Sequence, residues 1–119
     1  MWVYDATKGS LSRGNLIGMG YSGFGPGKNN SAMEGVPDVG PIPRGEWTIV
    51  GPPTDTTDHG PYVLGLQPKV GTSTLGRSGF LMHGDSRINP GDASHGCIVM
   101  SRAIREMVWQ SGDRDLGVI

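Results

Sequence analysis

The chain has 119 residues, enough for one domain with a buried core, and we expect residues 1–119 to form a single domain. Ten basic and eleven acidic residues give a formal net charge of −1, which argues against nucleic-acid binding, because that depends on clustered Lys and Arg. No apolar run approaches the roughly 20 residues that cross a bilayer, and the opening MWVYDATKGS has no secretory-signal pattern, so we expect neither membrane insertion nor a cleavable signal.

Glycine and proline divide the chain into short apolar runs, which predicts short strands joined by tight turns. Residues 1–20 are predicted to form a hairpin, and the glycine-rich residues 21–40 an ordered surface loop. A β-rich run over residues 46–50 is expected to stop at Gly51-Pro52-Pro53, because proline lacks the N–H that a strand ladder uses. Further strands are predicted at residues 62–68, 79–84 and 98–100.

Only one segment has the pattern of a helix. Ser101 is a suitable N-cap, and Ile104, Met107 and Val108 recur at the spacing of one helical face. Gly112 stands where a C-terminal cap belongs. About six strands and one helix predict a mainly β fold.

The residues that can carry chemistry gather in HGDSRINPGDASHGC, which holds two of the three histidines and the only cysteine. This cluster is open to three interpretations: a nucleophile with its base, a metal site, or a turn-rich segment without chemistry. His83 ends one predicted strand and Cys97 precedes another, so the fold can bring the two side chains together.

In the first interpretation Cys97 is a nucleophile, and a nearby imidazolium lowers the pKa of its thiol below the usual value of about 8.5. His83 is the expected base, because residues at i and i+2 of an extended segment lie side by side and His95 therefore does not converge on the sulfur. The backbone N–H groups of Gly96 and Cys97 are candidates to stabilise an oxyanion.

In the second interpretation His83, His95 and Cys97 bind zinc, with His59 or Asp85 as a fourth ligand. The spacing matches no known zinc pattern, so a zinc-dependent hydrolase is kept as an alternative only. We expect no metal and no other cofactor.

The segment HGDSRINPGDASHGCIVMS resembles the catalytic motif of the L,D-transpeptidases, a histidine followed after a short loop by Ser-His-Gly-Cys and an apolar strand. GPIPRGEWTIV is similar to an upstream strand of that family. With W-x-Y near the start, YSG and GRSGFLMHGDS, nearly the whole chain is similar to a small branch of single-domain L,D-transpeptidase-like effectors, which bacteria inject into rivals by type VI secretion.

The resemblance implies a β-sandwich- or barrel-like fold with one C-terminal helix, acting on the tetrapeptide stems of peptidoglycan. Cys97 would attack the carbonyl of the third stem residue and release D-Ala, after which water (L,D-carboxypeptidase) or an amine (transpeptidase or D-amino-acid exchange) resolves the thioester. His83 would be the base and the Gly84 carbonyl would orient its imidazole. The wall on the oxyanion side would consist of Ser94, His95 and Gly96.

The chain departs from the family at Val99, where many members have an arginine two residues after the cysteine. If that arginine holds a substrate carboxylate, either Arg77, Arg87 or Arg102 replaces it here or the contact is missing. We assign Arg77, Asp85 and Arg87 to substrate binding.

The resemblance also implies an antibacterial toxin that acts in the periplasm of a target cell, and we expect a monomer with an immunity protein as a possible partner. A non-catalytic peptidoglycan-binding module of the same fold is the main alternative.

Overall fold

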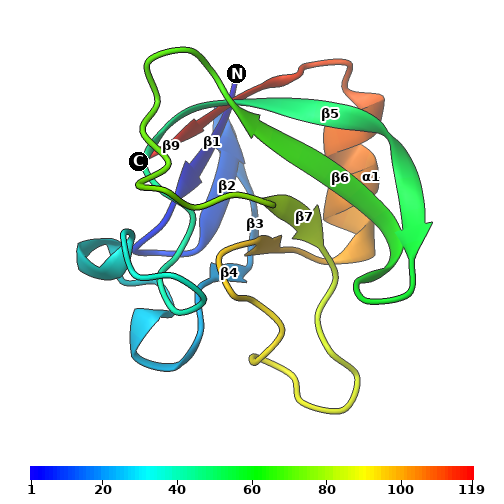
Figure 1. Ribbon diagram of the computed structural model, residues 1–119. Coiled ribbons are helices and arrows are strands. Elements are labelled where there is room, and N and C mark those ends of the chain that lie inside the picture. The colour runs from blue at the N-terminus through cyan, green and yellow to red at the C-terminus, as the bar shows by residue number, and fades with distance from the viewer.

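Nine strands form one sheet in the order β3-β2-β1-β9-β5-β6-β7-β8-β4 in the computed structural model, which describes all of residues 1–119 (Figure 1). The mainly β prediction with one helix near the C-terminus is confirmed. The strands are β1 Trp2–Asp5, β2 Ser10–Arg13, β3 Asn15–Met19, β4 Tyr21–Ser22, β5 Gly45–Thr56, β6 Gly60–Pro68, β7 Leu81–His83, β8 Ile98–Val99 and β9 Asp115–Val118. The helix α1 spans Arg102–Gln110, and two 3-10 turns, η1 Gly25–Gly27 and η2 Ser31–Met33, lie between β4 and β5.

The sheet curls until its two edges meet. β3 and β4 occupy opposite ends of the strand order, yet only Gly20 separates them in the chain. Gly20 leaves no room for a side chain, because a Cβ there would lie 1.9 Å from the carbonyl oxygen of Val99. This close approach lets the chain cross directly from one edge of the sheet to the other.

Several predicted strands are confirmed, one prediction needs correction, and one strand was missed. The hairpin at the start is present as β1 and β2, followed by the antiparallel β3. The strand expected to stop at Gly51 continues to Thr56, because the pairing with β6 shifts register between Val50 and Thr54 and so leaves the prolines outside the regular ladder. β9 was not predicted: only four residues long, it lies between β1 and β5, and its burial comes from those neighbours.

The helix begins and ends close to where the sequence predicts. Ser101 caps it by accepting a hydrogen bond from the backbone N–H of Ile104, at 3.4 Å. The predicted apolar face is wrong at Met107, which is 50% exposed, while Arg105 is buried beside Val108. Burial of Arg105 is possible because its guanidinium donates to backbone carbonyls, including those of Pro61 and Tyr62.

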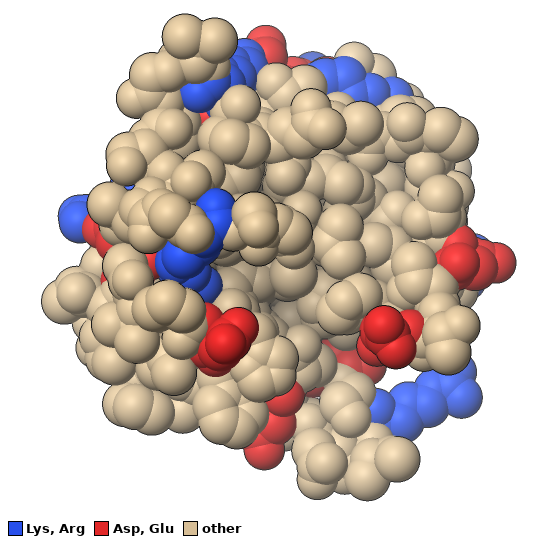
Figure 2. Space-filling model, viewed as in Figure 1, with Lys and Arg blue, Asp and Glu red and all other residues tan.

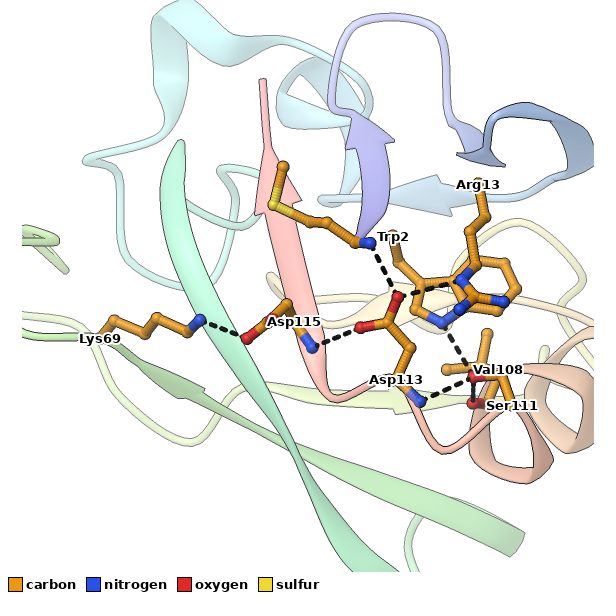
Figure 3. A network of polar contacts seen from close by, with 8 residues as sticks. Trp2, Arg13, Lys69, Val108, Ser111, Asp113 and Asp115 are labelled. Carbon is orange, nitrogen blue, oxygen red and sulfur yellow. Dashed lines mark hydrogen bonds and ion pairs between the residues drawn. The ribbon is translucent and has the colours of Figure 1, made fainter.

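The two ends of the chain are joined by the polar network in Figure 3. Asp113, which follows α1, accepts from the terminal ammonium of Met1 at 2.8 Å and from Arg13 at 3.0 Å. The ammonium group is the main reason why the pKa of Asp113 falls to about 2. Trp2 adds a hydrogen bond to Ser111 at 3.2 Å, so β1 is fixed against the end of α1.

Buried apolar side chains from both halves of the sheet form one core. Completely buried members include Tyr4, Leu11, Ile42, Trp47, Leu64, Met82, Ile98, Val108 and Leu116.

Replacement of core leucines tests this packing. Leu11→Ala is expected to lower the free energy of unfolding by about 2–5 kcal/mol, because it removes a fully buried side chain and leaves a cavity. The matched control is Leu16→Ala on the adjacent strand, where the side chain is 63% exposed and the change should stay within about 0.5 kcal/mol. Urea unfolding followed by fluorescence measures both, and equal effects would contradict the assignment of Leu11 to the core.

Candidate active site

A cavity of about 350 Å³ lies where four segments of the chain meet. The segments are the loop after η2, the turn between β5 and β6, residues 76–80 before β7, and residues 93–97 before β8. Figure 2 shows a hollow on this face, with both basic and acidic side chains near its edge. The lining includes the predicted site residues Arg77, His83, His95, Gly96 and Cys97.

Two neighbouring parallel strands place Cys97 and His83 together. Met82 of β7 lies opposite Ile98 of β8, and His83 lies opposite Val99. One residue earlier on each strand, Cys97 lies beside Leu81. Side chains alternate along a strand, so Leu81 and His83 point to the same face of the sheet, and Cys97 shares that face. Both side chains therefore line one cavity.

The imidazole of His83 has one nitrogen engaged and one without a partner. Nδ1 lies 2.8 Å from the carbonyl oxygen of Gly84, so Nδ1 carries the proton and donates it. Nε2 is buried and has no hydrogen-bond partner. Burial, followed by the nearby His59 and Arg105, lowers the pKa of His83, although the bond to Gly84 opposes the shift. A neutral imidazole with a free lone pair on Nε2 is the resulting form near pH 7.

Cys97 is held as a thiol in the resting protein. Burial raises the pKa of Cys97, while the backbone N–H of Leu81 and the positive charge of Arg77 oppose the shift. The Sγ atom lies 3.8 Å from the carbonyl oxygen of Gly79. This differs from the thiolate–imidazolium pair expected from the sequence, because the sequence does not show that both groups are removed from water.

The pH dependence of Cys97 alkylation follows from these two shifts. Labelling by iodoacetamide should be slow at pH 6 and rise with pH, with a midpoint above that of the same cysteine in urea-unfolded protein, which titrates at about 8.5. Mass spectrometry reads the label directly, since the chain has one cysteine. Rapid labelling at pH 5 would instead demonstrate a resting thiolate.

Ser94 shapes the turn before Cys97. Its buried Oγ donates to the carbonyl oxygen of Cys97 at 2.6 Å and accepts from the N–H groups of Gly23 at 2.9 Å and Gly96 at 3.1 Å. The Gly96 N–H is therefore engaged and not free for an oxyanion, contrary to our expectation. The N–H of Cys97 donates to no group of the protein and stays available.

Position 96 needs a glycine because of its backbone conformation and because of the atoms packed against it. Its φ of +133° lies in the region that favours glycine. A Cβ at this position would come within 2.5 Å of the Arg77 guanidinium and 3.1 Å of the Phe80 ring. Glycine in the motif thus allows Arg77 to pack directly behind the turn.

His95 belongs to a different wall of the cavity from His83. Its Nδ1 lies 3.0 Å from the carbonyl oxygen of Asp38, and its ring stacks on Phe24 with centroids 5.2 Å apart. These contacts hold the exposed His95 ring to the loops around η1 and η2.

Arg77 was assigned to substrate binding, but most of its donors are already engaged. The buried guanidinium donates to four backbone carbonyl oxygens. They belong to Pro41 at 2.8 Å, Gly40 at 2.9 Å, His95 at 3.1 Å and Glu34. The Arg77 guanidinium forms no ion pair with a carboxylate, although Asp38 acts on it from nearby, and its positive charge favours the thiolate form of Cys97.

The other two predicted substrate residues lie outside this cavity. Asp85 accepts from the Tyr21 hydroxyl at 2.6 Å and from the N–H groups of Ser86 and Gly91, so it organises its own loop. The exposed Arg87 lines a second groove of about 1060 Å³, which also contains Arg102 and shares His59, His83 and His95 with the cavity.

Sequence reasoning overlooked two residues near His83. His59 was considered only as a zinc ligand, yet its ring stacks on that of His83. The sequence pointed only weakly to Arg105, which stands as a charged residue next to an apolar helical face.

The zinc alternative receives no support from the side-chain arrangement. No three His, Cys, Asp or Glu side chains are placed to hold a metal ion.

The fold and site define a curled, mainly β protein in which two parallel strands present a cysteine and a histidine to one cavity. The family model described as the Tlde1 domain matches residues 17–115, and the chain belongs to this family of L,D-transpeptidase-like type VI secretion effectors. The resemblance found in the sequence is thereby confirmed. No curated protein and no solved structure matches the chain.

Family membership is consistent with an antibacterial effector that is secreted and acts in a target cell. It also suggests enzymatic activity, a peptidoglycan target and a cognate immunity protein. α1 is too short to cross a bilayer, and the structure contains no longer helix.

Proposed function

We propose that the protein is a cysteine-dependent enzyme that cleaves the tetrapeptide stems of peptidoglycan between the third residue and the terminal D-Ala. The observation that carries the proposal is the shared cavity of Cys97 and His83, with Nδ1 of His83 engaged by Gly84 and Nε2 free. This is the arrangement of a thiol nucleophile beside a base whose tautomer is fixed by a third group.

The reaction begins from the neutral pair. As the substrate carbonyl approaches, Nε2 of His83 accepts the thiol proton and the sulfur of Cys97 forms a bond to the carbonyl carbon. A neutral starting pair suits this step, because a base with a lowered pKa is unprotonated at neutral pH and ready to accept.

The tetrahedral intermediate carries a negative charge on oxygen. The free N–H of Cys97 is the backbone donor proposed to stabilise that charge, and the buried Arg77, which forms no ion pair with a carboxylate, adds a positive charge. The imidazolium of His83 then donates its proton to the leaving amine of D-Ala, the C–N bond breaks, and a thioester with Cys97 remains.

A second nucleophile resolves the thioester. Neutral His83 removes a proton from water, which hydrolyses the thioester, or from an incoming amine, which forms a new peptide bond. The first outcome is L,D-carboxypeptidase activity, and the second is transpeptidation or D-amino-acid exchange. Ser94, His95 and Gly96 shape the wall beside this step. Most donors of Arg77 are engaged, so Arg77 is proposed to act on the substrate through its charge, while Asp85 and Arg87 are proposed to bind more distant parts of the stem in the second groove.

The direct test is incubation of the protein with purified disaccharide-tetrapeptides, followed by mass spectrometry. Conversion to tripeptides would identify hydrolysis, and incorporation of an added D-amino acid would identify exchange. A peptidoglycan-binding module without activity would bind the stems and leave their masses unchanged, which would refute the enzyme proposal.

The site of action is proposed to be the periplasm of the target cell, where peptidoglycan lies. Expression in a susceptible bacterium should be toxic when a signal peptide directs the protein to the periplasm, and harmless when the protein stays in the cytoplasm. Colony counts after induction measure the difference, with the Cys97→Ala variant carrying the same signal as the control. Equal toxicity from both compartments would contradict a cell-wall target.

A further inference from the structure

The ring of His59 stacks on the ring of His83, with centroids 4.5 Å apart and an angle of 30° between the planes. His59 lies in the turn between β5 and β6, whereas His83 ends β7. Both line the cavity of Cys97 and the larger groove beside it. Such a distance is typical of favourable aromatic pairs. A second histidine therefore lies in contact with the proposed base.

The turn that carries His59 is held in place on both sides of this residue. The N–H of His59 donates to Oγ1 of Thr56 at 2.9 Å. On the other side, the buried guanidinium of Arg105 donates to the carbonyl oxygens of Pro61 at 2.8 Å and Tyr62 at 2.9 Å. Burying a guanidinium without a carboxylate partner costs free energy, because the cation loses its contacts with water. The hydrogen bonds of Arg105 to Pro61 and Tyr62 offset this cost, and they also fix the turn to α1.

The stacked ring helps to exclude water from the base. His83 is only 2% exposed, and its Nε2 is buried without a hydrogen-bond partner. A water molecule on Nε2 would occupy the lone pair that the mechanism needs for the thiol proton. Keeping this atom dry preserves it for the reaction.

We propose that His59 is a positioning residue for His83: its ring covers one face of the imidazole, holds that ring in a single orientation and keeps water from Nε2. The inference rests on the proposed function, in which His83 is the base.

The charged groups around His83 determine the direction in which its pKa should change when the His59 ring is removed. His59 faces it from the β5–β6 turn, Arg105 from α1, and Asp85 from the segment after β7. Burial and the two basic groups lower the pKa of His83, while Asp85 opposes them. Removing the His59 ring reduces both the burial and the repulsion, so the pKa of His83 should rise. More His83 is then protonated at pH 6, where it cannot accept a proton.

The experiment compares His59→Ala, His59→Phe and Thr57→Ala. Phe preserves the stacked ring without a titratable group, and Thr57 is an exposed neighbour in the same turn. In His59→Ala, kcat on tetrapeptide stems should fall about tenfold at pH 8 and more at pH 6, because the base is no longer held in place. His59→Phe should restore most of the rate, and Thr57→Ala should behave as the unsubstituted protein.

NMR titration of the His83 imidazole provides a readout that needs no substrate. The pKa of His83 should be higher in His59→Ala than in the unsubstituted protein, and the rise should be smaller in His59→Phe, because Phe keeps the burial of His83 and removes only the repulsion. An unchanged His83 titration in His59→Ala would overturn the inference, as would a loss confined to KM. If the unsubstituted protein does not cleave stems, the proposed function fails, while the titration still decides whether His59 controls His83.

Discussion

Cys97→Ala should remove activity on tetrapeptide stems, with a loss of about 10³-fold or more in kcat. Without the sulfur no thioester can form, and the cavity offers no second thiol because the chain has a single cysteine. The measurement is the rate of tripeptide formation from purified disaccharide-tetrapeptides, followed by mass spectrometry.

The loss must be separated from unfolding. The side chain of Cys97 is small and only half-buried, so Cys97→Ala should keep its melting temperature within a few degrees of that of the unsubstituted protein. Cys97→Ser is the conservative companion, because it keeps the volume but replaces the thiol with a far weaker nucleophile. Activity of a folded Cys97→Ala variant near the original level would refute the nucleophile assignment.

His83→Ala should lower kcat by about 10²–10⁴-fold, the range expected when a general base is removed. His83 ends β7 on the face that Cys97 shares, and its Nε2 has no hydrogen-bond partner. His95→Ala should retain measurable activity, since the ring of His95 is held by the Asp38 carbonyl and by Phe24.

The proposed activity should fall as the pH is lowered. The pKa of His83 lies below its ordinary value of about 6.5, so the neutral base is present at pH 7 and is lost only as pH falls through the lowered pKa. The acid limb of kcat/KM should therefore lie below pH 6.5. A larger loss from His95→Ala than from His83→Ala would reverse the assignment of the base.

Local sequence patterns were sufficient to predict the class of fold and to locate the candidate site. Short apolar runs between glycines and prolines predict a mainly β protein, and Ser101 marks the start of the helix, because these signals act within a few residues. The Ser-His-Gly-Cys motif and His83 likewise lie close together in the chain. Their resemblance to the L,D-transpeptidases correctly indicated the family.

Tertiary structure decided the features that depend on distant segments. The buried four-residue β9, the extension of β5 past Gly51, and the meeting of the two sheet edges at Gly20 all arise from pairing between strands. A four-residue strand has too little pattern of its own, and its partners decide whether it forms.

The chemistry of the site was decided in the same way. Burial keeps Cys97 a thiol and the His83 imidazole neutral, and burial is a property of the packed chain that no local pattern contains. The amide of Gly96 is engaged by Ser94, and the ring of His59 reaches His83 from another strand pair. The sequence alone determined which residues could react, and folding determined their protonation, their partners and their access to water.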